Sequence, residues 1–265
     1  MTQISVDSWS SGEAYEAYMG RWSRAVAQRF VEWLAIPESA HWLEVGCGTG
    51  ALTRAICERC QPASVLACDP SATFIEQARA NASGPCSFMV IAPGSALPGR
   101  EGGYDAVVSG LVLNFLADPK ASLLGMRERC AAGGTVAAYI WDYADGVEFL
   151  RSFWEEAVAV DASAVGMDES RRFAEFDEPA LLDLFRAAGL SNIASRPIEI
   201  ATNFHGFDDY WRPFLGGVGP APSYLASLDE TQREELRRRL EQRLLVGSDG
   251  LIRLRARAWV VRGKR

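Results

Sequence analysis

Apolar residues recur along the chain with two different spacings, and the spacing changes from segment to segment. Between residues 13 and 35, Trp22, Val26 and Phe30 recur every four residues, which is typical of a helix with one buried face. From residue 41 onward, short apolar runs alternate with stretches of helical spacing. The runs predict strands at residues 41–46, 65–69, 86–91, 104–109 and 134–141. The stretches between them predict helices at residues 50–60, 71–82 and 119–131.

This alternation of strands and helices favours one architecture. Strand–helix units at such spacing predict a parallel sheet that is covered by helices on both faces. The runs "DAVVS" and "TVAAYIW" are apolar throughout, as expected for strands that are buried on both sides.

The last third of the chain has a different pattern. Residues 178–190 predict a helix that ends at Gly189, and "RPIEIAT" predicts a strand. Residues 203–228 are rich in aromatic residues, glycine and proline, which predicts an ordered cap. In the terminal segment "LIRLRARAWVV", apolar residues alternate with arginines, so we expect a strand with one solvated side at an antiparallel edge of the sheet.

Composition and charge narrow the class of protein. The chain has 265 residues, 48% of them hydrophobic, and a formal net charge of −7, which suits one domain with elaborations. The basic run 237–243 has helical leucine spacing and is interpreted as the solvated face of a helix, so we expect no nucleic-acid partner. No apolar run reaches the ~18–20 residues of a membrane span, and residues 1–15 do not resemble a secretory signal.

The six cysteines follow no metal-binding or disulfide pattern. They are irregularly spaced, and the single C-x-x-C at Cys57 and Cys60 has no second ligand pair at zinc spacing. We therefore expect reduced thiols, no bound metal, no membrane association and a cytoplasmic location.

The stretch "WLEVGCGTGALT", residues 42–53, is a glycine loop between a predicted strand and a predicted helix. Gly46, Gly48 and Ala51 satisfy the dinucleotide fingerprint, which alone would also suit a nicotinamide-dependent oxidoreductase. Gly50 adds a third glycine, and Glu44 places a carboxylate where it can meet an ammonium group but would repel a pyrophosphate. These two features favour a ligand with an amino-acid end.

The chain resembles the class I S-adenosylmethionine-dependent methyltransferases, in particular the small-molecule group with the loop E/D-x-G-x-G-x-G. The resemblance extends from "YEAYMGRWS" to the terminal strand, and it includes "VLACDPS" at 65–71, "GGYDAVVSGLVLNFLADP" at 102–119 and "AAGGTVAAYIWDY" at 131–143. It implies an α/β fold with a seven-stranded Rossmann-like sheet, strand order 3-2-1-4-5-7-6, an antiparallel strand 7, helices on both faces and an aromatic-rich cap.

The resemblance also implies a site for S-adenosylmethionine, with S-adenosylhomocysteine as product. Backbone amides of Gly46 to Gly50 would face the cofactor, Glu44 its ammonium group, Asp69 both ribose hydroxyls, and Pro70 the adenine. The implied cofactor-binding residues are Tyr15, Tyr18, Trp22, Glu44, Gly46, Cys47, Gly48, Gly50, Asp69, Pro70, Ser71, Gly94, Ser95, Ser109, Gly110 and Leu111. In "APGSALP", 92–98, Pro93 replaces the family's adenine-binding Asp, so a carboxylate and an N–H are missing from the implied adenine site.

Candidate catalytic residues follow from the position of the cap and the strand ends. His205 in the cap has the chemistry of a general base, although a loop histidine with no such role has the same sequence pattern. Asp142 and Tyr143 follow the fifth strand, where they either line an acceptor pocket or anchor a loop. Trp22 likewise suits a core position of its helix. No Asn/Asp-Pro-Pro-aromatic clamp of amino-methylating nucleic-acid and protein enzymes follows the fourth strand.

The sequence thus predicts methyl transfer to a small-molecule acceptor at oxygen, nitrogen or carbon, by a monomer or homodimer. The alternative is a protein that binds S-adenosylmethionine or S-adenosylhomocysteine without methyl transfer, as a degenerate subunit or a cyclase. We expect a single methyltransferase domain over residues 1–265. Its parts are an N-terminal cap helix at 1–40, a cofactor-binding core at 41–142 and cap or substrate insertions at 143–180 and 203–247.

Overall fold

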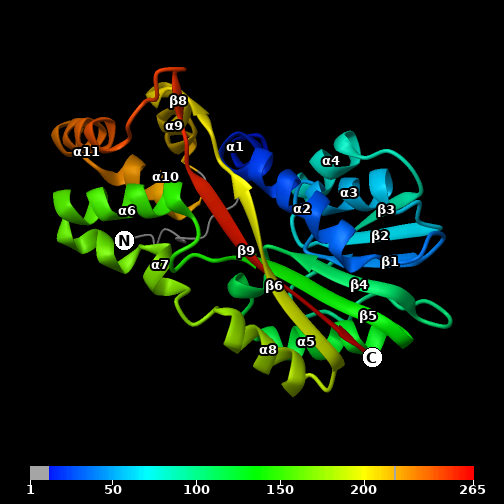
Figure 1. Cartoon of the computed structure of the whole chain (residues 1–265). Coiled ribbons are helices and arrows are strands. Elements are labelled where there is room, and N and C mark those ends of the chain that lie inside the picture. Colours follow the sequence, from blue (N-terminus) through cyan, green and yellow to red (C-terminus); the bar gives the residue numbers. More distant parts are fainter. Residues whose placement is uncertain (1–11, 218) are drawn as a thin grey trace. The chain divides into compact units, whose positions relative to one another are not determined.

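The computed structural model describes residues 12–217 and 219–265 (Figure 1). The part of the predicted N-terminal cap that falls on residues 1–11 lies outside the described residues, as does Val218 of the later insertion. The predicted first helix is present from residue 12 but is not one regular α-helix. It consists of α1 (Gly12–Tyr15), a π-helix η1 (Glu16–Gly20) and α2 (Arg21–Leu34).

The described residues form a seven-stranded sheet with the order β3-β2-β1-β4-β5-β9-β6. The first five strands are parallel neighbours. Each observed strand coincides with a predicted one, although β5 and β6 begin earlier than the apolar runs indicate. The strands are β1 (His41–Val45), β2 (Ser64–Asp69), β3 (Cys86–Val90), β4 (Tyr104–Gly110), β5 (Cys130–Trp141), β6 (Ser191–Ala201) and β9 (Arg255–Lys264).

Strand β9 is antiparallel to its neighbours and lies inside the sheet. The Arg265 N–H donates to the Gly134 carbonyl, whereas the Asp142 N–H donates to the Arg257 carbonyl, so β5 and β9 run in opposite directions. The expected antiparallel strand is therefore confirmed, but its expected position at the edge is wrong, because β6 is the edge strand. Alternating apolar and polar residues indicate that one side of a strand faces solvent. They are equally compatible with a strand at the edge and with a strand between two neighbours.

Helices cover both faces of the sheet, and β5 shows how the faces are divided. The ring of Tyr139 lies 4.6 Å from that of Phe30 in α2, whereas Ala138 and Ile140 belong to a core cluster with residues of α5 (Pro119–Arg129) and α8 (Glu178–Ala187). Successive strand residues point to opposite faces, so α2 and the α5–α8 pair cover different sides. Helix α4 (Ala72–Asn81) contacts β2 and β3, and α3 (Ala51–Arg59) contacts β2.

The chain divides into two compact units. The sheet unit comprises Ser23–Ile140, Phe176–Ile198 and Ala258–Arg265; the aromatic unit comprises Met1–Trp22, Trp141–Glu175 and Glu199–Arg257. Strands β5, β6 and β9 each contribute residues to both units. Besides α1 and η1, the aromatic unit contains α6 (Glu148–Val160), η3 (Ala162–Gly166), α7 (Glu169–Arg172), β7 (Phe204–His205), α9 (Phe207–Trp211), η4 (Arg212–Gly216), α10 (Pro220–Ser227), α11 (Glu230–Arg243) and β8 (Leu251–Ile252). A 3-10 turn, η2 (Leu113–Phe115), follows β4 in the sheet unit.

Aromatic side chains form the interior of the aromatic unit. The ring of Phe153 in α6 stacks on Phe214 at 4.6 Å, and Phe214 in turn contacts Tyr210 at 5.2 Å. Tyr210 contacts Phe204 at 5.3 Å, which extends the cluster to β7. The segment 203–228, which the sequence predicts to be an ordered cap, thus supplies part of this unit's core.

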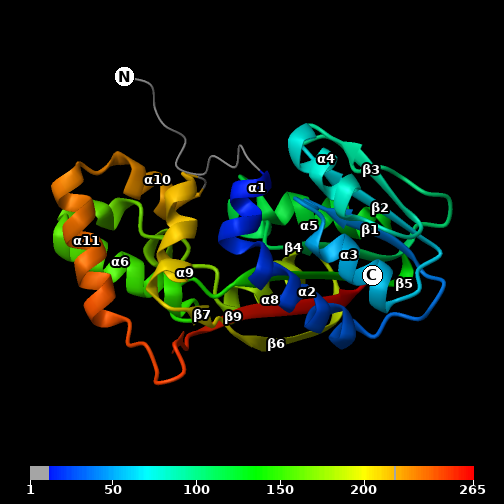
Figure 2. The ribbon, with the colours of Figure 1, turned by 90° about the horizontal axis from the view of Figure 1, so that it is seen from above.

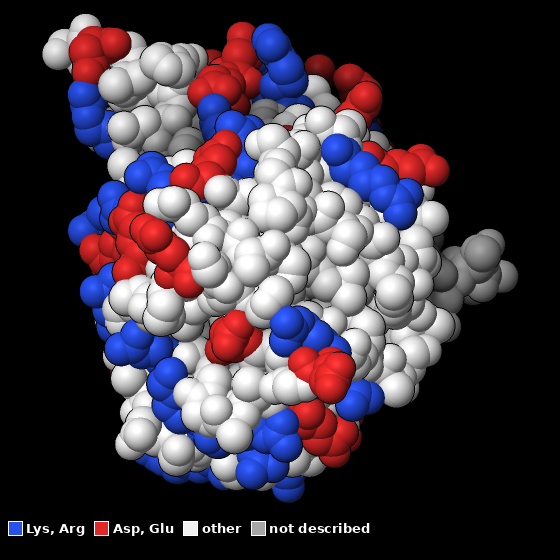
Figure 3. Space-filling model, turned by 90° about the vertical axis from the view of Figure 1, so that its right-hand side faces the viewer, with Lys and Arg blue, Asp and Glu red and all other residues white. Residues whose placement is uncertain are grey.

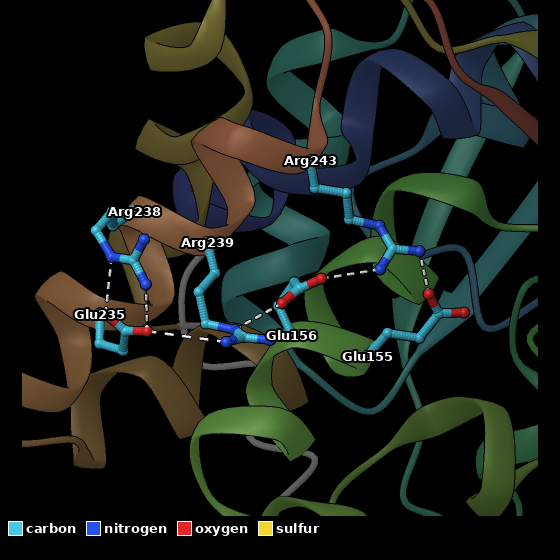
Figure 4. Close-up of polar contacts among 6 residues, drawn as sticks. All are labelled: Glu155, Glu156, Glu235, Arg238, Arg239 and Arg243. Carbon is cyan, nitrogen blue, oxygen red and sulfur yellow. Dashed lines mark hydrogen bonds and ion pairs between the residues drawn. The ribbon is translucent and has the colours of Figure 1, made fainter.

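Ion pairs join α6 to α11 on the outside of that core (Figure 4). Glu156 accepts from Arg239 at 2.7 Å and from Arg243 at 2.9 Å, and Arg243 also pairs with Glu155. Leu236 and Leu240 of α11 are buried, whereas Arg237, Arg238 and Arg243 are exposed, so the basic run 237–243 is for the most part a solvated helix face, as predicted. Burial raises the pKa of Glu156, but its hydrogen bonds from Arg243 and Arg239 leave that pKa below its usual value.

Candidate functional site

The loop between β1 and α3 turns sharply at its glycines. Gly46 and Gly48 have φ angles of 75° and 52°, a region that residues with a Cβ rarely adopt. A Cβ on Gly46 would lie 2.6 Å from Cγ2 of Val112, whereas a Cβ on Gly48 would meet no atom within 4 Å. The loop therefore packs tightly at Gly46 and leaves room for a ligand to approach the backbone at Gly48.

Most amides of this glycine loop are used within the protein. The N–H groups of Gly46 and Cys47 donate to the Cys68 carbonyl at 2.8 and 3.0 Å, and that of Gly50 donates to the Cys47 carbonyl at 2.9 Å. The expectation that the amides from Gly46 to Gly50 all face a cofactor is therefore wrong for these three residues. The first turn of α3, which begins after Gly50, still presents N–H groups, because the first amides of a helix have no acceptor within it.

Asp69 ends β2 and is held by two backbone amides. The Gly48 N–H donates to its Oδ2 at 2.9 Å, and the Ser71 N–H donates to its Oδ1, also at 2.9 Å. The Ser71 hydroxyl accepts from the Phe74 N–H and so caps α4, whereas Pro70 is exposed. Burial raises the pKa of Asp69, and the two amides oppose that rise. The carboxylate is thus fixed at the carboxyl end of β2, beside the glycine loop.

Glu44 lies on β1 and is 1% exposed. The Thr53 hydroxyl in α3 donates to its Oε2 at 2.5 Å. Burial raises the pKa of Glu44 to about 8, although the bond from Thr53 lowers it and nearby Asp69 raises it further. A carboxyl group with such a pKa ionises readily only when a positive group approaches it.

The predicted residues after β4 mainly bind the sheet itself. The Ser109 hydroxyl donates to the Val45 carbonyl at 2.8 Å, and the Leu111 N–H donates to the Tyr139 carbonyl at 2.7 Å. A Cβ on Gly110 would lie 2.6 Å from the Tyr139 ring, so glycine allows this close approach. One residue here escaped the sequence analysis: among the described residues, the buried carboxamide of Asn114 in η2 has no hydrogen-bond partner for either its oxygen or its nitrogen.

The loop after β3 is exposed around Pro93, where the family's adenine-binding Asp is missing. The Ser95 N–H donates to the Ala92 carbonyl at 3.1 Å and so closes a turn, with Gly94 at a φ of 76°. The amide that the sequence offers at Ser95 is therefore already used, and the Ser95 hydroxyl and the Gly94 amide are left as candidate contacts.

Three predicted cofactor residues, Tyr15, Tyr18 and Trp22, belong to the aromatic unit. Tyr18 is 4% exposed, and its ring lies 5.3 Å from that of Phe214. Burial is the main cause that raises the pKa of Tyr18 well above its ordinary value, and the negative charge of Glu169 raises it further. Glu169 is itself 2% exposed and accepts from Trp154 Nε1 at 2.9 Å, and no sequence pattern singles it out.

The predicted catalytic residues also lie in the aromatic unit. The Asp142 carboxylate is 5% exposed and accepts from Nε and Nη2 of Arg257 at 2.7 and 2.5 Å. The ring of Tyr143 is buried and lies 5.0 Å from that of Phe173. His205 in β7 is exposed. Asp142 thus has a strong internal partner, Arg257, which stands 115 residues later in the sequence.

Other features of the described residues bear on the class of ligand. No group of three or more His, Cys, Asp or Glu side chains in the described part of the chain is arranged to hold a metal ion. None of its helices has the length and apolar character that crossing a membrane requires. On the face shown in Figure 3, Lys and Arg side chains lie beside Asp and Glu side chains.

A family model described as a methyltransferase domain matches residues 43–136, which include the glycine loop and Asp69. The biotin biosynthesis bifunctional protein BioCD of Bordetella avium is 35% identical over 115 residues, which are 43% of this chain and 24% of that protein. A malonyl-[acyl-carrier protein] O-methyltransferase of Magnetococcus marinus is 27% identical over 186 residues, which are 69% of this chain and 64% of that enzyme. The chain thus spans less than two thirds of the length of either relative.

Solved structures share the fold over most of the chain. Phosphoethanolamine N-methyltransferase 2 of Haemonchus contortus, in complex with S-adenosyl-L-methionine, superposes with a TM-score of 0.57 at 13% identity, and covers 98% of this chain and 58% of that one. Together with the family match and the sheet order, this similarity confirms the fold of the class I S-adenosylmethionine-dependent methyltransferases. Residues 43–136 are the part of that fold that the methyltransferase-domain model matches.

Proposed function

We propose that this protein transfers a methyl group from S-adenosylmethionine to a small-molecule acceptor. The observation that carries the proposal is the fixed carboxylate of Asp69, which accepts hydrogen bonds from one amide of the glycine loop and one at the start of α4. It lies at the carboxyl end of β2, the edge where parallel α/β sheets bind ligands.

The residues around Asp69 have the chemistry that the cofactor requires. Each Asp69 oxygen accepts one amide and keeps a lone pair, so the carboxylate can accept from two vicinal ribose hydroxyls. The space beside Gly48, which a side chain would fill, allows close approach to the backbone. Glu44 would bind the ammonium group, directly or through water, and the carboxamide of Asn114 is a further candidate contact. When bound, S-adenosylmethionine supplies an electrophilic methyl group on a sulfonium.

The acceptor side of the reaction is assigned to the aromatic unit. The names of two curated relatives, both malonyl-[acyl-carrier protein] O-methyltransferases, support oxygen as the methylated atom. Asp142 Oδ2 accepts two hydrogen bonds from Arg257, which favours a positioning role over that of a base. Positioning can supply much of the rate of such a displacement, and His205 is kept as the candidate base.

The test is the melting temperature with and without S-adenosylmethionine, with NADH as the control ligand. A ligand at 100 times its dissociation constant adds about 2.7 kcal/mol to the free energy of unfolding, which raises the melting temperature of a chain of this size by roughly 5–10 °C. A shift with NADH alone, or with neither ligand, would contradict the proposal.

Pro93 favours one competing function, namely binding of the cofactor without methyl transfer. Single-turnover formation of S-adenosylhomocysteine with a panel of carboxylic acids, phenols and amines separates the two. Product with any acceptor class supports methyl transfer. A melting shift with no product from any class supports the alternative.

A further inference from the structure

Arg21, the first residue of α2, is held in a fixed orientation within the aromatic unit, and its side chain is 31% exposed. The Arg21 guanidinium carbon lies 4.2 Å from the centre of the Trp22 ring and 4.7 Å from that of Phe204. Its Nη1 donates to both oxygens of Asp209 at 3.1 Å. Asp209 Oδ2 also accepts from the His205 N–H at 2.9 Å, so the carboxylate that holds Arg21 is itself anchored.

The other edge of this guanidinium has no partner. Nε and Nη2 of Arg21 are buried and, within the described residues, neither has a hydrogen-bond partner. The same holds for Nε1 of Trp22, a residue that is only 8% exposed. These unpaired groups are all donors, and leaving buried donors unpaired is costly unless a ligand binds them.

We infer that the Nε–Nη2 edge of Arg21, with Trp22 Nε1 beside it, binds a carboxylate of the acceptor. This inference rests on the proposed methyl transfer and names the substrate class of that reaction. The two parallel N–H groups of an arginine edge match the two oxygens of a carboxylate. A dianionic phosphate fits less well, because Asp209 already places a negative charge on the same guanidinium.

The surroundings of Arg21 assign the carboxylate to the acceptor and not to the cofactor. Trp22 contacts Phe149 and Phe204 at 6.5 and 5.4 Å, and both come from the segments 143–180 and 203–247 of the predicted substrate insertions. The residues assigned to the cofactor around Asp69 belong to the sheet unit. Tyr15, Tyr18 and Trp22, which the resemblance also assigns to the cofactor, belong to the aromatic unit, and this inference reassigns Trp22 to the acceptor. The names of two relatives include malonyl-[acyl-carrier protein], and a malonyl group that is attached at one end carries a free carboxylate of this kind at the other.

The experiment measures calorimetric binding of three carboxylates and of their methyl esters to the full chain saturated with S-adenosylhomocysteine. The probes are malonyl-N-acetylcysteamine, phenylacetate and hexanoate. We expect at least one acid to bind the wild type ~10-fold or more tightly than its ester, and Arg21→Gln to abolish that preference. Trp22→Phe, which keeps the ring but removes the N–H, should reduce it only about threefold.

Two further variants make the result interpretable. Arg237→Gln is the matched control, because Arg237 also lies over an aromatic ring, that of Phe207 at 5.9 Å, and pairs with Asp208 at 3.5 Å. It should keep the wild-type preference. Arg21→Lys keeps the charge without the paired edge, and it replaces Arg21→Gln if that variant does not fold.

Cofactor binding distinguishes this inference from the proposed function. We expect the dissociation constant of S-adenosylhomocysteine to change less than about twofold in Arg21→Gln. If that affinity falls about tenfold while the affinity for methylthioadenosine, which lacks the amino-acid end, is unchanged, Arg21 binds the cofactor and the inference is wrong. It is also wrong if the wild type prefers none of the three acids. Failure of the wild type to bind S-adenosylhomocysteine at all would instead overturn the proposed function.

Discussion

The glycine loop and the Arg21–Trp22 edge both contain buried N–H donors, but only the donors of the loop have hydrogen-bond acceptors among the residues that the structure describes. In the loop, the amides of Gly46, Cys47 and Gly48 donate to acceptors on β2. At Arg21 and Trp22, three buried nitrogens have no acceptor in the described part of the chain. The loop is therefore organised before any ligand binds, whereas the arginine edge is completed only by one.

This difference predicts how the two regions respond to substitution. A change in the loop removes bonds that the folded protein already makes, so it should lower both the free energy of unfolding and the affinity for the cofactor. At the arginine edge, Trp22→Phe removes no bond of Nε1 to a described residue, so it should affect acceptor binding with a smaller loss of stability, whereas Arg21→Gln also removes the ion pair with Asp209. The first three of the following experiments test the loop side of this comparison, and the last tests an ion pair of the aromatic unit.

Gly46→Ala should have the largest effect. The substitution forces alanine to adopt a φ of 75° and places its Cβ 2.6 Å from Val112. A left-handed backbone conformation costs alanine ~1–2 kcal/mol, and overpacking costs a further ~1–3 kcal/mol. We therefore expect urea titration to give a free energy of unfolding about 3 kcal/mol below that of the wild type. Gly133→Ala is the control, because Gly133 has a φ of 73° and open space around it. Equal losses in both variants would show that Val112 is not a tight contact.

Asp69→Asn should weaken binding of S-adenosylhomocysteine roughly 100-fold, which corresponds to about 2.7 kcal/mol. Asparagine keeps one acceptor oxygen, so it cannot accept from both Gly48 and Ser71 while it binds a ribose. Asp105→Asn is the matched control, because Asp105 Oδ2 also accepts a backbone amide of the sheet, that of His41 at 2.8 Å. Unchanged affinity in Asp69→Asn would remove Asp69 from the cofactor site.

Glu44 should couple cofactor binding to pH. Its pKa is raised to about 8, so in the ligand-free protein it binds a proton that the unfolded chain releases above about 4.5. The free energy of unfolding should therefore fall as pH rises from about 4.5 to about 8, and Glu44→Gln should remove this slope. Urea unfolding at pH 5.5 and 7.5 measures it.

The same group should influence affinity. An ammonium group near Glu44 favours the carboxylate, so affinity for S-adenosylhomocysteine should rise up to ~10-fold from pH 6 to 7 in the wild type. Glu44→Gln, which can still accept from Thr53, should show no such rise. A parallel pH dependence in both proteins would place the ammonium group elsewhere.

The smallest effect is expected in the aromatic unit, at the ion pairs between α6 and α11. Glu156→Gln should lower the free energy of unfolding by ~0.5–1 kcal/mol at low salt and by less in 1 M NaCl, because salt screens exposed partners. The pKa of Glu156 is lowered in the folded protein. The contribution of Glu156 to the free energy of unfolding is therefore fully present above the ordinary pKa of a glutamate, and it is lost as pH falls through the lowered pKa. Glu235→Gln, which affects pairs within α11 alone, should cause a smaller change.

The loop and the sheet could be predicted because their determinants are close in sequence. Gly48 and Asp69 are 21 residues apart, and Thr53 is 9 residues from Glu44. Apolar runs mark β1, β2 and β4 directly, since buried parallel strands need no alternation. The Asp that ends β2 is likewise readable from a short motif.

The arginine edge could not be predicted in this way. Arg21 and Asp209 are 188 residues apart, and nothing in either local sequence indicates the other. Whether a donor is left unpaired depends on every neighbour in the folded unit, so the sequence could not indicate that Trp22 Nε1 and the Asn114 carboxamide lack partners among the described residues. Apolar spacing at 3.6 residues per turn likewise cannot indicate the π-helix η1, which directly precedes α2.

Both compact units are assembled from three separate stretches of chain, and this has an evolutionary consequence. No single crossover between two genes can exchange the aromatic unit while leaving the sheet unit intact. We therefore expect acceptor specificity among descendants of this chain to change by point substitution and by loop insertion within segments such as 143–180, and not by the shuffling of a ready-made module.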